Sequence, residues 1–148
     1  MIDYKDIKKA VNKQLSKTEI EIMSRDVEEG FNRPSFFVEL DNVNRSSTVS
    51  QIERSLTVRI YYFPSERYNY SIEVLEMQDK LEDLFDLKLK IKSRWLNILD
   101  YQSFVNDGVL SCSFDIEFED GRHSEKNVDE EELRKDYPIE DMEELYFK

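Results

Sequence analysis

One strongly alternating segment late in the chain limits what this protein can fold into. From Leu110 to Phe118, apolar residues alternate with polar ones without a break. Because successive side chains of a strand point to opposite faces of a sheet, this pattern predicts a strand with one buried and one solvated face. Asp107-Gly108, just before it, readily adopts the positive φ angles of a tight turn, which predicts a hairpin with the preceding strand. The apolar positions are Leu110, Cys112, Phe114, Ile116 and Phe118.

Two other segments have helical periodicity. In residues 4–15 apolar side chains recur every three or four residues, with Asp3 placed as an N-cap. In residues 71–85 a second stripe has the same spacing, which predicts the main core helix, with Asn69 or Ser71 as its cap. The stripes consist of Ile7, Ala10, Val11 and Leu15, and of Val74, Met77, Leu81, Leu84 and Phe85.

The remaining alternating segments predict further strands. They are residues 20–22, 35–43 and 56–63. The third strand could start as early as Thr48, and Pro64 ends it. Residues 44–47, between the second and third strands, have the composition of a connection. Residues 88–92 predict a short strand directly after the core helix, and residues 95–105 one more. The expected fold class is α+β, with a mostly antiparallel or mixed sheet of about five to six strands. The N-terminal helix and the main core helix pack on it.

Negative charge is concentrated after this sheet. The net charge is −12, and residues 119–148 carry 12 acidic against 5 basic side chains. We expect one α+β domain over residues 1–120 and an acidic C-terminal extension over residues 121–148. Pro138 precedes apolar residues at helical spacing, which predicts a short helix over residues 138–147. A disordered acidic end is an equally weighted alternative.

Composition argues against most kinds of catalytic site. The chain has one Cys and one His, too few for an ordinary zinc site, and its three Gly residues form no phosphate-binding pattern. Asp115, Glu117 and Glu119 line one strand face and could bind Mg²⁺ or Ca²⁺ weakly, but no neighbouring base or nucleophile makes a hydrolytic site. We expect no cofactor, no metal and no catalytic residue, hence a protein that is not an enzyme. We expect Cys112 to be a small buried hydrophobe.

Charge and hydropathy also limit the partners. The lysines of residues 5–17 are best explained as a solvated helix face, so we expect no nucleic-acid sequence recognition. No run approaches the ~18 apolar residues of a membrane span, and the N-terminal residues have no signal-peptide core. We therefore expect that the protein does not associate with a membrane. We expect it to be made in a cytoplasm.

Residues 29–40, Glu-Gly-Phe-Asn-Arg-Pro-Ser-Phe-Phe-Val-Glu-Leu, carry a family resemblance. Gly30 permits a positive φ and Pro34 pushes the preceding residue towards an extended conformation, so the segment predicts a turn leading into a strand. It resembles the start of an early strand in phage tail terminator proteins, especially those of contractile tails. Residues 59–64, Arg-Ile-Tyr-Tyr-Phe-Pro, are similar to the strand before that family's main helix. The resemblance in element order extends over residues 2–120.

The resemblance implies an assembly function. Such proteins form a ring, usually hexameric, that caps the tail tube, stops its polymerisation and presents a surface to head-completion proteins. The implied partners are further copies of the chain, the tail tube protein, a head-completion protein and the sheath protein of a contractile tail. The implied location is a virion or phage-tail-like particle, reached from the host cytoplasm.

We place the expected assembly surfaces on segments that the core does not use. These are residues 44–50, 65–70 and 106–108, which combine polar and aromatic side chains at strand ends. The candidate interface residues are Arg45, Ser47, Ser65, Glu66, Arg67, Tyr68, Tyr70 and Asp107.

Other functions stay open on the sequence alone. Another head-to-tail connector or tail tube ring component would share a small α+β architecture without an active site. An acidic mimic of nucleic acid would suit the net charge of −12. A hydrolase that uses Asp115, Glu117 and a metal would show a thermal shift on addition of Mg²⁺ or Ca²⁺.

Overall fold

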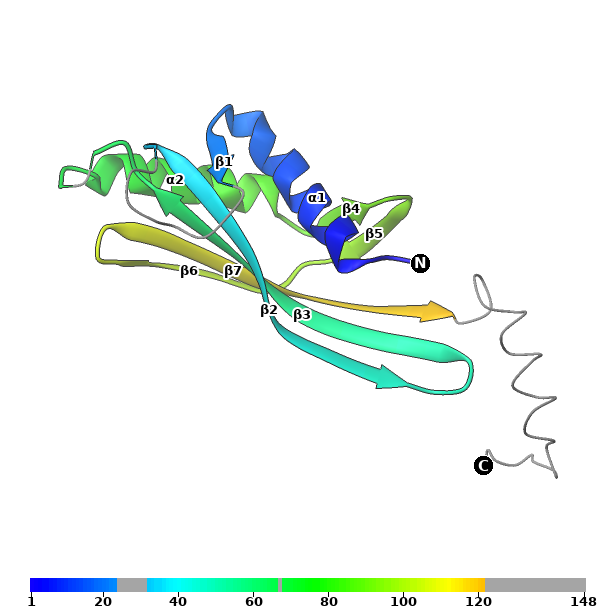
Figure 1. The fold of residues 1–148 in the computed structure, drawn as a ribbon. Helices are drawn as coiled ribbons and strands as arrows, with labels where there is room; N and C mark the ends of the chain where they lie inside the picture. Colours follow the sequence, from blue (N-terminus) through cyan, green and yellow to red (C-terminus); the bar gives the residue numbers. More distant parts are fainter. Residues whose placement is uncertain (24–31, 67, 122–148) are drawn as a thin grey trace, which may run out of the picture. The chain divides into compact units, whose positions relative to one another are not determined.

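Two helices and a mixed sheet make up the fold in the computed structural model, which describes residues 1–23, 32–66 and 68–121. Five strands form one sheet in the order β1-β2-β3-β7-β6, and β4 pairs with β5 in a second sheet (Figure 1). β1 is parallel to β2, and β6 is antiparallel to β7. The predicted α+β class is confirmed. The elements are α1 (Tyr4–Leu15), a 3₁₀ turn (Ser16–Thr18), β1 (Glu21–Met23), β2 (Ser35–Ser47), β3 (Gln51–Phe63), α2 (Ser71–Leu84), β4 (Lys88–Ile91), β5 (Arg94–Asn97), β6 (Leu99–Asn106) and β7 (Val109–Gly121).

The chain divides into two compact units. The larger unit comprises Ile2–Asn44 and Ser55–Glu117, and it contains both helices. The smaller unit includes Arg45–Arg54 and residues 118–121 of the described chain. The turn at Gly30 and the helix expected over residues 138–147 lie outside the described residues.

The alternating segment at residues 110–118 forms β7, as predicted. All five of its apolar side chains are buried, none more than 6% exposed. In the larger unit the ring of Phe114 lies 5.3 Å from that of Phe85, at the end of α2, and 6.4 Å from that of Tyr101 in β6. The hairpin before β7 is also confirmed, because Asp107 and Gly108 have φ angles of 55° and 76°.

The other face of β7 is less solvated than its polar residues predict. Ser113 is only 8% exposed, and Asp115 is half-buried. β7 lies between β3 and β6, so neighbouring side chains cover this face. The hydroxyl of Thr57 in β3 donates a hydrogen bond of 2.7 Å to the Asp115 carboxylate. The expectation of a wholly solvated face is therefore wrong.

Residues 44–47 are strand, not the predicted connection. β2 continues to Ser47 and β3 begins at Gln51, so the turn lies at residues 48–50. Thr48 closes this turn: its N–H donates to Gln51 O at 2.8 Å, and its hydroxyl oxygen accepts from Gln51 N–H at 3.0 Å. A polar side chain that bonds to nearby backbone in this way favours a turn.

The single strand expected over residues 95–105 is two strands in two sheets. β5 ends at Asn97 and β6 begins at Leu99. Ile98 N–H donates to Leu87 O at 2.9 Å, and Asp100 has a φ of 53°. The strand register then shifts between Leu99 and Gln102. The backbone therefore bends between the two strands, where alternation alone predicts continuity.

The N-cap of α2 is Tyr70, and neither Asn69 nor Ser71 has that position. Tyr70 O accepts the Val74 N–H at 2.9 Å, so the helix starts one residue earlier than a Ser71 cap would allow. Glu73 in the first turn fixes this geometry. Its carboxylate accepts hydrogen bonds from the hydroxyl of Tyr62 and from both the N–H and the hydroxyl of Ser65, the last two at 2.8 and 2.6 Å.

α1 forms over the predicted residues. The Asp3 N–H donates to the Asp6 carboxylate at 2.8 Å, which completes the start of the helix. Ile7, Val11 and Leu15 are fully buried. The side-chain amide of Gln14 donates to Leu84 O at 2.5 Å and so joins α1 to the end of α2, and both helices lie on one side of the sheet (Figure 1).

Replacement of Phe114 should measure the contribution of the β7 core. Phe114→Ala should lower the free energy of unfolding by about 3–5 kcal/mol, because a buried ring is lost and a cavity is left. Phe104→Ala in the neighbouring strand is the matched control, since Phe104 is 54% exposed, and it should change little. Denaturant unfolding compares the two. Equal losses would contradict this account of the core.

Glu73 should make stability dependent on acid. Partial burial raises the pKa of Glu73, but hydrogen bonds from Ser65 and Tyr62 outweigh it and lower the pKa below its ordinary value of 4.5. As the pH falls through that range, the unfolded chain takes up a proton before the folded chain does, so this stabilisation is lost. Glu73→Gln should cost about 1–2 kcal/mol at pH 7 and progressively less towards pH 3. Unfolding across pH, with Glu76→Gln as control, tests this; a pH-independent difference would contradict it.

Candidate assembly surfaces

Within residues 1–23, 32–66 and 68–121 no group of three or more His, Cys, Asp or Glu side chains could hold a metal ion. Cys112 is buried, as expected, and burial raises the pKa of its thiol to about 11. A thiol with that pKa is protonated at neutral pH and is a poor nucleophile. None of the helices in these ranges is long and apolar enough to cross a membrane.

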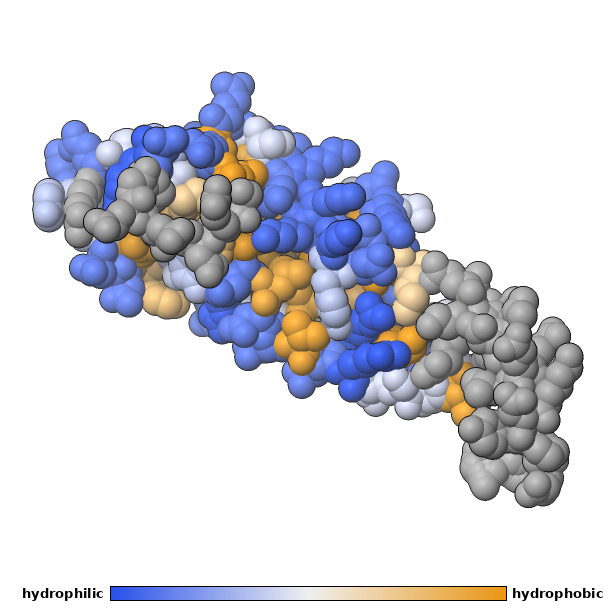
Figure 2. Space-filling view, viewed as in Figure 1, coloured by the Kyte–Doolittle hydropathy of each residue, from blue (hydrophilic) through white to orange (hydrophobic). Residues whose placement is uncertain are grey.

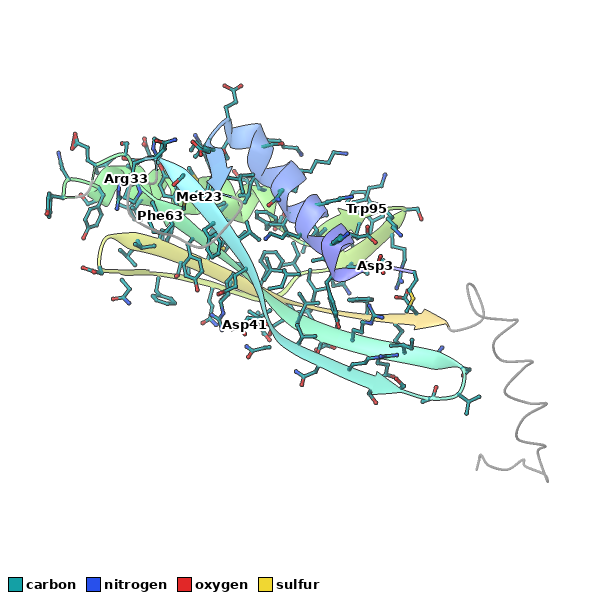
Figure 3. All side chains as sticks on the ribbon, viewed as in Figure 1. Asp3, Met23, Arg33, Asp41, Phe63 and Trp95 are labelled. Carbon is teal, nitrogen blue, oxygen red and sulfur yellow. The ribbon has the colours of Figure 1, made fainter. Side chains whose placement is uncertain are left out.

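The two segments that carry the family resemblance lie against each other. Arg33, before β2, donates to Pro64 O at 3.2 Å, and its guanidinium carbon lies 5.9 Å from the centre of the Phe63 ring (Figure 3). Two aromatic pairs join β2 to β3 beside this contact, at centroid distances of 5.2 Å for Phe36 with Tyr62 and 6.2 Å for Phe37 with Tyr61. The resemblance therefore rests on residues whose side chains form contacts between β2 and β3.

One end of the larger unit carries apolar side chains on its surface. Tyr68 is 87% exposed, Ile72 67% and Leu75 59%. Helix α2 and strand β6 approach each other near these residues, because Gln78 donates to the Ser103 hydroxyl at 3.1 Å. In Figure 1 the start of α2 and the turn between β6 and β7 lie towards the same end.

We call this surface the apolar end and define it by Tyr68, Ile72, Leu75 and Val105. Val105 follows Ser103 by two residues in β6, so both side chains point to the same face of that strand. Ile72 and Leu75 lie on α2 outside its buried stripe, where such a helix usually carries polar side chains, so the stripe alone does not predict them. The sequence does contain a signal for this exposed surface, because Ile72 and Leu75 are apolar residues that lie outside the buried stripe of α2.

The structure places the predicted interface residues in separate regions. In the larger unit, Ser65, Glu66, Tyr68 and Asp107 are exposed, whereas Tyr70 is half-buried at the N-cap of α2. In the smaller unit, Arg45 and Ser47 are exposed at the end of β2. Arg67 lies outside the described residues. Ser65 is exposed, but its hydroxyl and N–H already bond to Glu73.

A second surface is a groove lined by α1, β4 and β5, with a volume of about 610 Å³. We call it the lysine groove, because six of the residues that line it are lysines. Among the described residues that line it, Asp6 is the only one with an acidic side chain. The surface over α1 is correspondingly hydrophilic in Figure 2. The lysines are Lys9, Lys13, Lys17, Lys88, Lys90 and Lys92.

The positive charge of the lysine groove is only partly balanced. The Asp6 carboxylate accepts a hydrogen bond from the Asp3 N–H and forms an ion pair with Lys92 at 3.2 Å. The hydrogen bond from Asp3, together with the charges of Lys92 and Lys9, lowers the pKa of Asp6. The ammonium of Lys90 lies 5.7 Å from the ring centre of Trp95, which is 60% exposed (Figure 3). Among the described residues, no carboxylate lies within ion-pair distance of the ammonium groups of Lys13, Lys17 or Lys88.

The lysine groove was also missed in the sequence analysis. Lys9, Lys13 and Lys17 recur every four residues on a helix, and Lys88, Lys90 and Lys92 every two residues on a strand. Each set alone is typical of a solvated face. Their proximity depends on α1 packing beside β4, which no local pattern reveals.

Comparison with known proteins identifies the family. No curated protein matches the chain. One solved structure aligns with 82% of this chain and 96% of its own at 12% identity, but the TM-score of 0.38 is too low to support any conclusion. The profile of a family described as phage tail terminator protein matches residues 6–128. The chain therefore belongs to the phage tail terminator family, a family of structural proteins, and has a role in phage tail assembly.

Proposed function

We propose that this protein forms a ring, hexameric in the assembled tail, on the finished end of the tail tube. The ring stops tube polymerisation and gives head-completion proteins a surface to bind. The observation that carries the proposal is the family match over residues 6–128. Its tail-particle location and its partners, namely further copies, the tube protein, a head-completion protein and a contractile sheath, follow from this assignment.

A ring that stops polymerisation has two physical requirements. Each copy must bind the next through two different surfaces, so that the contacts close on themselves. The exposed side of the ring must then differ from the tube end, or another tube ring would add. A protein with this function needs surfaces of distinct chemistry on one rigid scaffold, and it needs no catalytic group.

The apolar end is the surface that we assign to contact with the tube or with a neighbouring copy. Tyr68, Ile72 and Leu75 together expose aromatic and aliphatic area of the kind that forms the centre of protein interfaces. Glu66 and Asp107 belong to the charged rim of this surface, and Arg67 is assigned to it from its position in the chain. Arg45 and Ser47 belong to a second contact, made by the end of β2.

We propose that the chain consists of two parts. Residues 1–120 form the terminator domain, and residues 121–148 form an extension with 10 acidic against 5 basic side chains. The domain provides the scaffold of the ring.

Removal of the gene distinguishes this function from a related one. Tails assembled without the chain should be overlong or should fail to join heads, whereas the absence of tubes would indicate a tube component instead. Electron microscopy of tail length measures this directly. Tubes of normal length that join heads would contradict the proposal.

Changes at the apolar end should reproduce that phenotype. The combined variant Tyr68→Ala, Ile72→Ser and Leu75→Ser should yield overlong or headless tails, since each exposed apolar contact in an interface contributes on the order of 1–2 kcal/mol. Leu87→Ser is the matched control, because Leu87 is 73% exposed and lies outside the apolar end. The comparison needs tail-length distributions and a check that each variant is folded. Tails of normal length and head joining in the triple variant would remove this surface from the proposal.

A further inference from the structure

We propose that the lysine groove binds the acidic segment of a second copy of this chain, residues 129–144. This inference rests on the proposed ring, because it assigns one of the contacts between neighbouring copies. The two surfaces are different and complementary, as a contact that closes a ring requires.

The groove has the chemistry of a receptor for an acidic peptide. In the part of the chain that the structure describes, six lysines and one acidic side chain line it, and the net charge of the whole chain is −12. The one carboxylate, Asp6, is already held by Asp3 and Lys92. Positive charge that is concentrated against the net charge of a protein favours an anionic partner.

An aromatic side chain adds selectivity for a peptide over a small anion. Trp95 is 60% exposed in the lining of the groove, and Lys90 lies over its ring. An exposed tryptophan beside lysines offers apolar area together with charge, which suits a segment that mixes acidic and apolar residues.

Residues 129–144 have that mixed composition. They begin with four consecutive acidic residues, Asp129 to Glu132, and contain five further Asp or Glu against two basic residues. Leu133, Tyr137 and Ile139 are interspersed among them. The groove and the segment therefore match in charge and in apolar content.

Titration of a peptide into the full-length chain tests the contact. Trp95 is the only tryptophan of the chain, so its fluorescence reports on the groove. A synthetic peptide of residues 125–148 contains no tryptophan and should produce a saturable change. At about 1 M salt the change should weaken strongly, because exposed charge pairs are screened.

A charge-reversed groove gives the specific comparison. The variant Lys9→Glu, Lys13→Glu and Lys88→Glu should bind the peptide at least about tenfold more weakly. Lys5→Glu with Lys8→Glu is the control, since these lysines lie on the same helix but outside the groove lining, and it should bind as the unaltered chain does. Circular dichroism and thermal unfolding establish that both variants fold. Equal binding by the groove variant and the control would overturn the proposal, and so would a peptide that binds none of the proteins.

A third variant separates binding to a second copy from binding within one copy. Reversal of Asp129 to Glu132 to lysine removes the chain's own acidic run. If the peptide binds this variant but not the unaltered chain, even at a dilution at which the unaltered chain is monomeric, the segment fills the groove of its own copy, and the proposal of a second copy is wrong.

Mixing variants in the full chain gives an independent readout. The groove variant and the segment variant should each lose intermolecular cross-links between lysine and carboxylate side chains, and an equimolar mixture should regain them. Isotope labelling of one partner identifies links between copies. Cross-links that return only when both changes are in one chain would also overturn the proposal.

The outcome is separable from that of the ring proposal. Normal tail length without the chain would contradict the ring function even if the peptide binds the groove. Overlong tails without the chain, together with equal peptide binding by the groove variant and the control, would leave the ring function standing and remove this contact from it.

Discussion

The burial of one face of β7 is the constraint on which the larger unit depends. Leu110, Cys112, Phe114 and Ile116 have at most 1% exposure. They require a cover of aromatic and aliphatic side chains, which α2 supplies through Phe85. Once α2 lies there, Gln14 joins α1 to its end and Gln78 joins its middle to β6. The positions of both candidate surfaces follow from this packing.

Much of the fold can be predicted from the sequence because its signals are local. The alternation in β7 and β3, the helical stripes of α1 and α2 and the positive φ angles at Asp107 and Gly108 all arise from neighbouring residues. The failures have a common physical cause. The bend at Ile98 and the start of α2 at Tyr70 depend on hydrogen bonds to residues elsewhere in the chain or across a turn, so alternation and capping preferences alone do not reveal them.

The candidate surfaces could be predicted only in part. Polar and aromatic connections correctly indicated exposed residues such as Glu66 and Tyr68. The exposed apolar surface at Ile72 and Leu75 is not predicted, because a helix that buries one stripe is expected to be polar elsewhere. The lysine groove cannot be predicted from the sequence for a different reason. Charge that is spread over two distant segments becomes concentrated only when the fold brings α1 and β4 together.

The two strands at the margins of the main sheet affect how copies of this protein can meet. Within the described residues β1 has three residues, and β6 carries a register shift between Leu99 and Gln102. Short or bulged edge strands offer a poor template for another strand, which protects a protein against edge-to-edge aggregation. Pairing between backbones of two copies along β1 or β6 is therefore disfavoured, so that contacts between copies at these two strands fall to side chains.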